Sequence, residues 1–573
     1  MKSPRADEHT AQMIIKDSMW QLKTSLYGRR GALKNEQMKN ISILLLTFLV
    51  SVGMVGCKKF LNTTPTDTLT PEDYYSTESN MVKALAGVYD RLGSEPMFGN
   101  FIFSEWDGGT DDSYYARSGQ VTGLQVYNFD FSDNRINSYW NDCYMGIQRA
   151  NQLIANIDLP KMDEEKRKAI LGEAKFLRGF YYFQLATRFG GVPLRLEPVT
   201  APTNVDIERA PLAAVYEQIL KDMKEAEEVL PQSSKIGYSS RVSKTVAQGV
   251  LARVCLHMAG EPLKDQSRYA EALTWAKKVQ ESGEHALRTT FNPNLTNSAY
   301  SQIFINHSQD IYDVKESMWE VDFIGNRTDG FTETGRVGNT LGVTMTMVSI
   351  EADTGYCYGF IRGTGRLYKL YGNGDLRREW ALGTYTYNNT TGLRVAIANT
   401  AANMYVRDAA KWRRSYELVT PKNKNYGPTN YPLLRYADVL LMLAEAENQV
   451  NGPTPAAYEA LNMVRRRGYG EPVALPSAVA DAPEGMSKDA FQIYIEDERS
   501  RELCFESLRR QDLIRWGKFI TGMKAVSADM ATNGGGVAYA RLAGQNVSER
   551  HLLYPIPSSE MSLNKKMVQN PGW

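Results

Sequence analysis

The sequence predicts a mostly α-helical fold, in which helix hairpins form a scaffold that carries long loops and minor β structure. Three observations support this prediction. Apolar residues recur at three- and four-residue steps in segments near both ends of the chain, and several of these segments come in pairs separated by a short turn. Between about residues 291 and 420 this periodicity gives way to Gly, Asn, Thr and aromatic residues.

The clearest helix begins after Asp163, a suitable N-cap, and ends before Gly190, Gly191 and Pro193. Its apolar stripe comprises Ile170, Ala174, Leu177, Tyr181 and Leu185. The same reasoning predicts helices over residues 79–92, 137–157, 211–230, 242–258, 267–282, 433–450, 455–467 and 487–515.

Several of these helices form antiparallel pairs. Residues 435–468 contain a helix, an Asn-Gly-Pro turn and a second helix that Pro455 opens; their length and small-residue spacing resemble a tetratricopeptide unit of about 34 residues. Residues 212–230 and 242–258 form a similar pair. Such units cannot bury their apolar faces alone, so we expect them to stack into one core.

The N-terminal region resembles a bacterial lipoprotein signal. In residues 38–56 a lysine precedes a short apolar run and small residues, and Cys57 follows, although Met54 stands where that pattern prefers leucine. We expect Cys57 to carry lipid, residues 57–78 to be an anchored spacer, and residues 79–573 to form a single domain. We interpret residues 1–37 as an over-long start with Met38 as the true beginning. The alternative is a buried apolar segment with an incidental cysteine.

Composition narrows the possible functions. The chain has 66 Lys and Arg against 65 Asp and Glu, so its net charge of +1 gives no electrostatic reason to expect a nucleic-acid partner. Cys143, Cys255, Cys357 and Cys504 lack CxxC spacing, and the apolar surroundings of Cys255 and Cys504 favour buried thiols. The five histidines are scattered, which argues against a histidine-built metal site. No cofactor is expected; structural calcium is one possibility for "DGGTDD", which lacks the ligand spacing of an EF-hand.

Several longer motifs resemble the SusD/RagB family of outer-membrane lipoproteins. These are "EAKFLRGFYYFQLATRFGGVPL", "RYADVLLMLAEAEN", "LNMVRRRG", "IEDERSRELCFESLRRQDLIRWG" and the terminal "LLYPIPSSEMSLNKKMVQNPGW". The resemblance covers roughly residues 57–573. It implies a lipid-anchored, surface-exposed outer-membrane protein that captures glycan, or in some members peptide, and caps a SusC-like TonB-dependent barrel.

The charged family motif has a structural interpretation that does not involve ligand. Its charged residues share helices with leucines at spacings suited to ion pairs between helices, so we expect a structural role for Arg499, Glu502, Arg509, Arg510, Asp512 and Arg515. The ligand site must then lie in the loops, which is where binding residues concentrate.

A carbohydrate site combines exposed aromatic rings with polar side chains. The segment 101–119 offers a first cluster of such residues: Trp106, Asp111, Asp112, Tyr114, Tyr115 and Arg117. The resemblance also places this loop among those that contact ligand. The mid-chain loops offer a second: Phe331, Tyr356, Tyr358, Phe360 and Arg362. The sequence leaves open whether the two clusters meet. Trp319 alternates with Val321 and Phe323, which favours a buried strand position over a binding one.

Two other classes of function compete with capture. A surface glycoside hydrolase is suggested by Glu105, Asp107, Asp111 and Asp112 in one loop, since glycosidases use paired carboxylates. No nucleophile elbow, P-loop or zinc-protease helix is present. A structural adaptor is the other candidate, since tetratricopeptide frames also bind protein partners.

Overall fold

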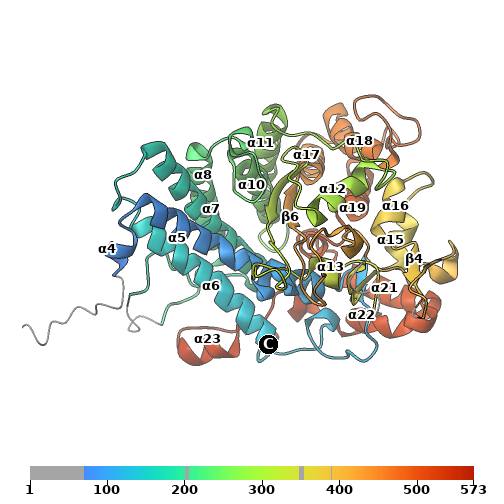
Figure 1. The fold of residues 1–573 in the computed structure, drawn as a ribbon, viewed down its shortest axis with the longest axis horizontal. Helices are drawn as coiled ribbons and strands as arrows, with labels where there is room; N and C mark the ends of the chain where they lie inside the picture. Colours follow the sequence, from blue (N-terminus) through green and yellow to red (C-terminus); the bar gives the residue numbers. More distant parts are fainter. Residues whose placement is uncertain (1–69, 201–205, 347–353, 389) are drawn as a thin grey trace, which may run out of the picture. The chain divides into compact units, whose positions relative to one another are not determined.

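The computed structural model describes residues 70–200, 206–346, 354–388 and 390–573. Its longer helices are α5 (Glu78–Asp90), α6 (Asn134–Ala155), α7 (Glu164–Phe189), α8 (Leu212–Val229), α10 (Lys244–Ala259), α11 (Arg268–Glu281), α12 (Ala299–Ser308), α17 (Tyr436–Asn451), α18 (Pro455–Tyr469), α19 (Lys488–Leu503) and α21 (Phe519–Asn533) (Figure 1). The shorter ones are α4 (Pro71–Tyr74), α9 (Ser233–Ile236), α13 (Val337–Thr340), α15 (Gly365–Leu370), α16 (Leu376–Ala381), α20 (Arg509–Arg515), α22 (Leu542–Asn546) and α23 (Ser558–Leu563). The strands are β1 (Ser113–Tyr115), β2 (Ser317–Val321), β3 (Ile361–Gly363), β4 (Tyr385–Tyr387), β5 (Arg394–Ala396) and β6 (Tyr431–Arg435).

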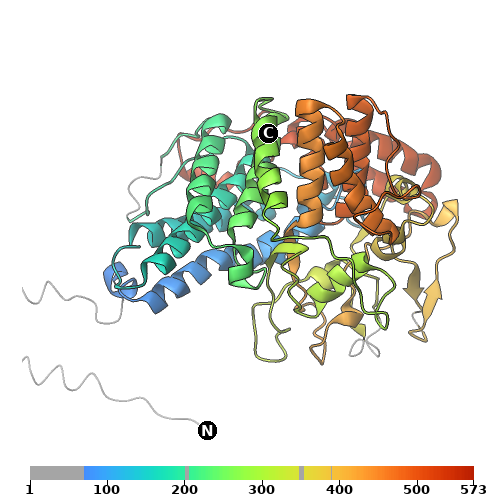
Figure 2. The same ribbon diagram turned by 90° about the horizontal axis from the view of Figure 1, so that it is seen from above.

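The mostly α-helical prediction is confirmed. Consecutive long helices pack as neighbours in the order α5, α6, α7, α8, α10, α11, α17, and both α18 and α19 pack on α17. Figure 2 shows these helices on one side of the segment that runs from α12 to β6. One predicted helix is wrong at its centre: residues 487–515 form α19 and α20, because Phe505 and Ser507 take left-handed backbone angles (φ 66° and 57°) between them.

Helix α7 shows how the sequence specifies this packing. The Asp163 side chain accepts a hydrogen bond from the backbone N–H of Lys166, and Gly190 ends the helix at φ 76°. Gly172 and Gly179 leave room for α8: a Cβ at Gly172 would lie 2.8 Å from Val229. Small residues on the α7 face therefore allow the two helices to approach closely.

The strands form three separate two-stranded antiparallel sheets, β1 with β3, β2 with β6, and β4 with β5. In β2 the Trp319 ring is fully buried and lies 4.8 Å from the Phe180 ring of α7. The predicted buried strand position of Trp319 is therefore confirmed, and this tryptophan fixes the small sheet to the helical scaffold.

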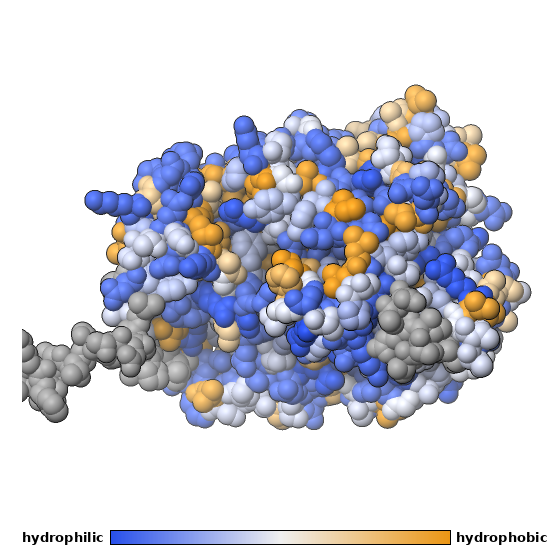
Figure 3. Space-filling view, viewed as in Figure 1, coloured by the Kyte–Doolittle hydropathy of each residue, from blue (hydrophilic) through white to orange (hydrophobic). Residues whose placement is uncertain are grey.

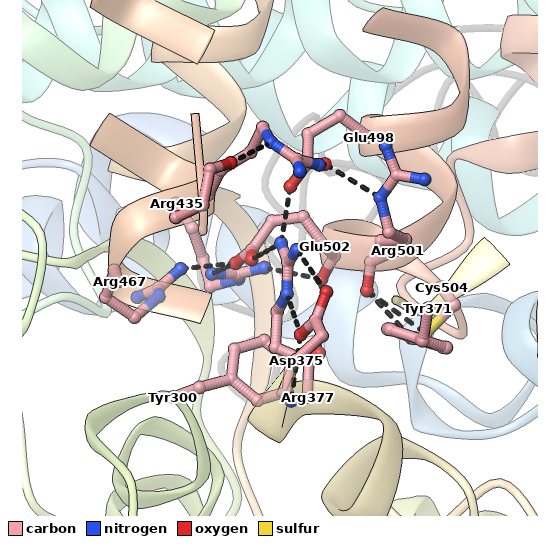
Figure 4. Close-up of polar contacts among 12 residues, drawn as sticks. Tyr300, Tyr371, Asp375, Arg377, Arg435, Arg467, Glu498, Arg501, Glu502 and Cys504 are labelled. Carbon is pink, nitrogen blue, oxygen red and sulfur yellow. Dashed lines mark hydrogen bonds and ion pairs between the residues drawn. The ribbon is translucent and has the colours of Figure 1, made fainter. Parts of the chain in front are cut away.

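A buried ionic network holds α19 against the mid-chain segment (Figure 4). The Glu502 carboxylate accepts hydrogen bonds from Arg377, at 3.0 Å, and from Arg435, at 2.9 Å. Burial alone would raise the pKa of Glu502, but the surrounding guanidinium groups have a larger, opposite effect, so the pKa lies below its ordinary value. Arg509 and Arg515 pair with Asp111 and Glu445 respectively. The predicted structural role of this charged motif is therefore confirmed.

The structure also bears on the expectations for the cysteines and for membrane-spanning helices. Cys143, Cys255, Cys357 and Cys504 are buried free thiols, as predicted for Cys255 and Cys504. Residues Pro71–Trp573 form one compact unit, within whose described residues no helix is both long and apolar enough to cross a bilayer. The expected extension, signal peptide and Cys57 lie outside the described residues.

The face drawn in Figure 3 is mostly hydrophilic, with hydrophobic residues in scattered patches. This face therefore has no single broad apolar area.

Candidate functional site

The two loop clusters meet through a short sheet. Strand β1 pairs antiparallel with β3, with Tyr114 opposite Arg362 and Tyr115 opposite Ile361. The pairing continues where the backbone N–H of Ala116 donates to the carbonyl oxygen of Phe360 at 2.7 Å. Segments more than 200 residues apart in the chain thus form one surface.

Residues 354–363 alternate between the surface and the interior. Tyr356, Tyr358, Phe360 and Arg362 are half-buried, whereas the residues between them are buried. This is the period of two expected of extended backbone. Gly359 has a positive φ of 56°, and a Cβ there would overlap the Thr344 side chain. Small residues on the inner face therefore let this segment lie flat and turn its aromatic side chains outward.

The outward rings form a continuous row, which we call the aromatic ladder and define as Tyr115, Phe360, Tyr358 and Tyr356. The Tyr115 and Phe360 ring centroids are 5.5 Å apart with an interplanar angle of 9°. The Phe360 and Tyr358 rings are 4.8 Å apart at 8°, and the Tyr358 and Tyr356 rings are 4.8 Å apart at 70°. The ladder is thus an ordered row of half-buried aromatic rings at the protein surface.

Charged and polar groups border the ladder. The Arg117 guanidinium lies 4.8 Å from the Phe360 ring centroid, and the Lys424 ammonium lies 4.7 Å from that of Tyr356. The Tyr358 hydroxyl donates to Asn425 at 3.3 Å, and Arg362 pairs with the buried Asp408 at 2.9 Å.

Burial and nearby charge also tune the ladder. Burial, followed by the charge of Glu105, raises the pKa of Tyr115 to about 12.

A cleft of about 750 Å³ is linked to the ladder by hydrogen bonds, although no ladder residue lines it. Arg336 and Tyr426 line it together with Val82, Tyr89 and Phe323. Arg336 donates to Asn339 at 3.1 Å, and the amide of Asn339 donates to the backbone oxygen of Tyr356 at 3.2 Å. Two hydrogen bonds therefore connect a residue that lines the cleft to the backbone of the ladder.

Trp106 does not belong to this surface. Its ring is fully buried, 4.3 Å from the Tyr554 ring and 4.5 Å from the Tyr139 ring. The expectation that Trp106 contacts ligand is wrong, because the loop folds into a single helical turn, η3 (Ile102–Trp106), whose aromatic side chains enter the core.

Asp111, Asp112 and Tyr114 are also inside, with exposed fractions of 3%, 1% and 2%. Asp111 accepts two hydrogen bonds of 2.7 Å from Arg509, and Asp112 accepts one of 2.6 Å from Thr110. The predicted ligand contacts of Asp111 and Asp112 are corrected to structural ones, because a buried carboxylate requires such partners. The prediction for Tyr114 is corrected as well, because its hydroxyl donates to the backbone oxygen of Tyr405 inside the protein.

Phe331 is exposed, at 55%, but it lies outside the ladder. Its carbonyl oxygen accepts from the backbone N–H of Arg327, within a loop whose neighbouring residues border the cleft. Of the predicted residues, the structure therefore brings together Tyr115, Arg117, Tyr356, Tyr358 and Arg362, along with Phe360.

Sequence reasoning missed Lys424, Asn425 and Arg336. The stretch "KNKNY" (422–426) mixes polar and aromatic residues as the recognised clusters do, and this signal would have identified it. Among the described residues, no group of three or more His, Cys, Asp or Glu side chains is placed to hold a metal ion.

Comparison with known proteins agrees with the fold. Two family models match, one described as SusD family over residues 315–573 and one described as starch-binding and associating with the outer membrane over residues 59–256. The SusD-like protein P25 of Formosa agariphila is 25% identical over 93% of this chain and 98% of its own length. The starch-binding protein SusD of Bacteroides thetaiotaomicron is 22% identical, covering 94% of this chain and 100% of its own.

The solved structures include a SusD homolog from Bacteroides thetaiotaomicron. It superposes with a TM-score of 0.78 at 28% identity, covering 88% of this chain and 98% of that one. Together with the charged α19–α20 motif and the helical scaffold, these matches show that the chain belongs to the SusD/RagB family.

Proposed function

We propose that this protein is a lipid-anchored outer-membrane receptor, exposed at the cell surface, that binds oligosaccharide or polysaccharide fragments. It passes them unaltered to a SusC-like TonB-dependent barrel. The observation that carries glycan binding is the aromatic ladder, in which Tyr115 joins Phe360, Tyr358 and Tyr356. Family membership supports the same class of ligand, since one matching model is described as starch-binding and associating with the outer membrane.

The acids of the early loop support capture over hydrolysis. A glycosidase needs two carboxylates beside its substrate. Asp107 pairs with Arg188 at 3.1 Å, Asp111 pairs with Arg509, and Glu105 pairs with Arg135. Because Asp107 and Asp111 are buried with arginine partners, they serve the fold.

The test of binding uses purified full-length protein, panels of glycans and peptides, gel retardation and calorimetry. Phe360→Ala should weaken glycan binding about 30-fold, because truncating a central aromatic contact costs about 2 kcal/mol. The control is Phe131→Ala, since Phe131 is a surface phenylalanine outside the ladder, 46% exposed, whose backbone contacts α23. Binding of peptides alone, or equal losses in both variants, would contradict the proposal. So would release of shortened sugars.

The anchor has its own test. Cys57→Ala should move the protein from the membrane to the soluble fraction while leaving it folded, because its attachment would depend on acyl chains on that thiol. Tight membrane retention of the variant would contradict the lipid anchor. Co-purification with the barrel tests the transport partner.

A further inference from the structure

Two cations border the aromatic ladder. Arg117 and Lys424 are exposed, and among the described residues neither has an acidic side chain within ion-pairing distance. Arg117 lies over Phe360 and, at 5.6 Å, over Tyr358, while Lys424 lies over Tyr356. The two cations therefore border both ends of the row that runs from Phe360 to Tyr356.

Within the part of the chain that the structure describes, other charged side chains near the ladder are paired. Arg362 pairs with Asp408 at 2.9 Å, Arg336 with Glu95 at 3.4 Å, and Glu105 with Arg135. The surplus at the ladder consequently comes from Arg117 and Lys424. A general basic character of the protein does not explain it, since the whole chain has a net charge of only +1.

Arg327 is a useful contrast. It lies 3.5 Å from the ring centroid of Tyr426, at the cleft, and has no ion pair among the described residues. The acids Asp329 and Glu333 belong to the same loop and are exposed, so the charge there is balanced. The loop of Arg327 thus contains acids of its own, whereas Arg117 and Lys424 form no ion pair among the described residues.

We infer that the ladder recognises anionic glycans, whose carboxylate or sulfate groups pair with Arg117 and Lys424 while their sugar rings lie against the aromatic side chains. This inference rests on the proposed glycan-binding function. A guanidinium binds carboxylate and sulfate oxygens through two parallel hydrogen bonds, and an ammonium acts as a point charge. A polymer with repeated anionic groups engages both cations at once, so two weak exposed pairs reinforce each other.

The experiment compares matched charged and neutral probes on the full-length protein by calorimetry. One pair is oligogalacturonate and its methyl ester, and the other is sulfated and desulfated κ-carrageenan oligosaccharide. The wild type should bind the charged member of at least one pair about ten-fold more tightly at low salt, and the preference should shrink as salt screens the charges. The pair that shows it distinguishes carboxylate from sulfate recognition.

Arg117→Gln and Lys424→Gln should each weaken binding of the charged probe about two- to five-fold more than binding of the neutral probe, as expected for exposed ion pairs. Lys221→Gln, on the exposed face of α8, is the matched control and should change neither.

Equal affinity for charged and neutral probes would overturn the inference while Phe360→Ala still tests glycan binding separately. Unchanged binding of the charged probe by a protein that carries both Arg117→Gln and Lys424→Gln would also overturn the inference. If these substitutions weakened only the binding of the barrel, the two cations would belong to the interface with the protein partner, and the inference would again be overturned. If no glycan binds at all, the proposed function fails together with the inference.

Discussion

The Asp111→Asn substitution separates a structural role for the early loop from a ligand-binding one. Asp111 is 3% exposed and accepts two hydrogen bonds of 2.7 Å from Arg509. The Arg366 guanidinium lies 3.4 Å from the same carboxylate. Asparagine keeps one acceptor oxygen but turns an N–H₂ group toward the guanidinium and leaves a buried positive charge unpaired. We therefore expect the free energy of unfolding to fall by about 3–5 kcal/mol.

Asp497→Asn is the matched control, because Asp497 pairs with the same Arg366, at 2.7 Å, on a side chain that is 29% exposed. Its loss should cost at most about 1 kcal/mol. Urea unfolding of the wild type and both variants, followed by circular dichroism, measures the difference. Glycan affinity measured well below the unfolding midpoint should be unchanged in both variants.

The effect should depend on pH in a defined direction. Burial raises the pKa of Asp111, but Arg509 and Arg366 outweigh it, so the folded-state pKa lies below the ordinary 3.8. A carboxylate with a lowered pKa contributes stability above about pH 4 and loses it as the pH falls through its folded value. The stability gap between wild type and Asp111→Asn should therefore persist at pH 7 and narrow in acid. Loss of glycan binding without loss of stability would refute this reasoning.

Three further predictions concern the ladder and the scaffold. Gly359→Val should abolish glycan binding, as calorimetry would show, because the side chain would overlap Thr344 at a backbone φ of 56°; full affinity would contradict the inner-face packing. Gly146→Ala should cost about 1–3 kcal/mol in urea unfolding, since a Cβ there would overlap the Tyr181 ring, and an unchanged midpoint would refute that close approach. Burial and then the charge of Arg515 lower the pKa of His257 to about 3. Below about pH 6.5 the unfolded state therefore binds one proton more than the folded state. As the pH falls toward 4, the free energy of unfolding of the wild type should decrease by up to about 1.4 kcal/mol per pH unit more than that of His257→Gln. Parallel pH profiles of the two proteins would contradict this.

The sequence pattern predicted local structure well where a single helical or strand periodicity was present. The stripe of α7, with Asp163 before it and Gly190 after it, was sufficient to predict that helix nearly to its ends. The alternation in "TGYCYGFIRG" (354–363) is equally local, and its aromatic residues were correctly singled out as a cluster. Both patterns depend on backbone geometry alone, which a short sequence window specifies.

Burial of individual loop residues was not predictable in this way. Trp106 and Tyr115 stand in the same polar, glycine-containing loop, yet Trp106 is sealed by Tyr554, whose hydroxyl donates to the Trp106 backbone oxygen from 448 residues away. Asp111 became structural because Arg509, far along the chain, supplies its counter-charge. No local signal distinguishes these residues from their exposed neighbours.

The sequence by itself determined the helical scaffold, the family and the two regions from which the aromatic ladder is built, because periodicity and motif order are properties of neighbouring residues. Only the tertiary structure decided that Tyr115 joins Phe360 and Tyr358 while Trp106 and Asp111 turn inward. The physical reason is that burial and ion pairing are settled by contacts between distant segments, and the favourable partner for a ring or a charge is fixed only when those segments pack.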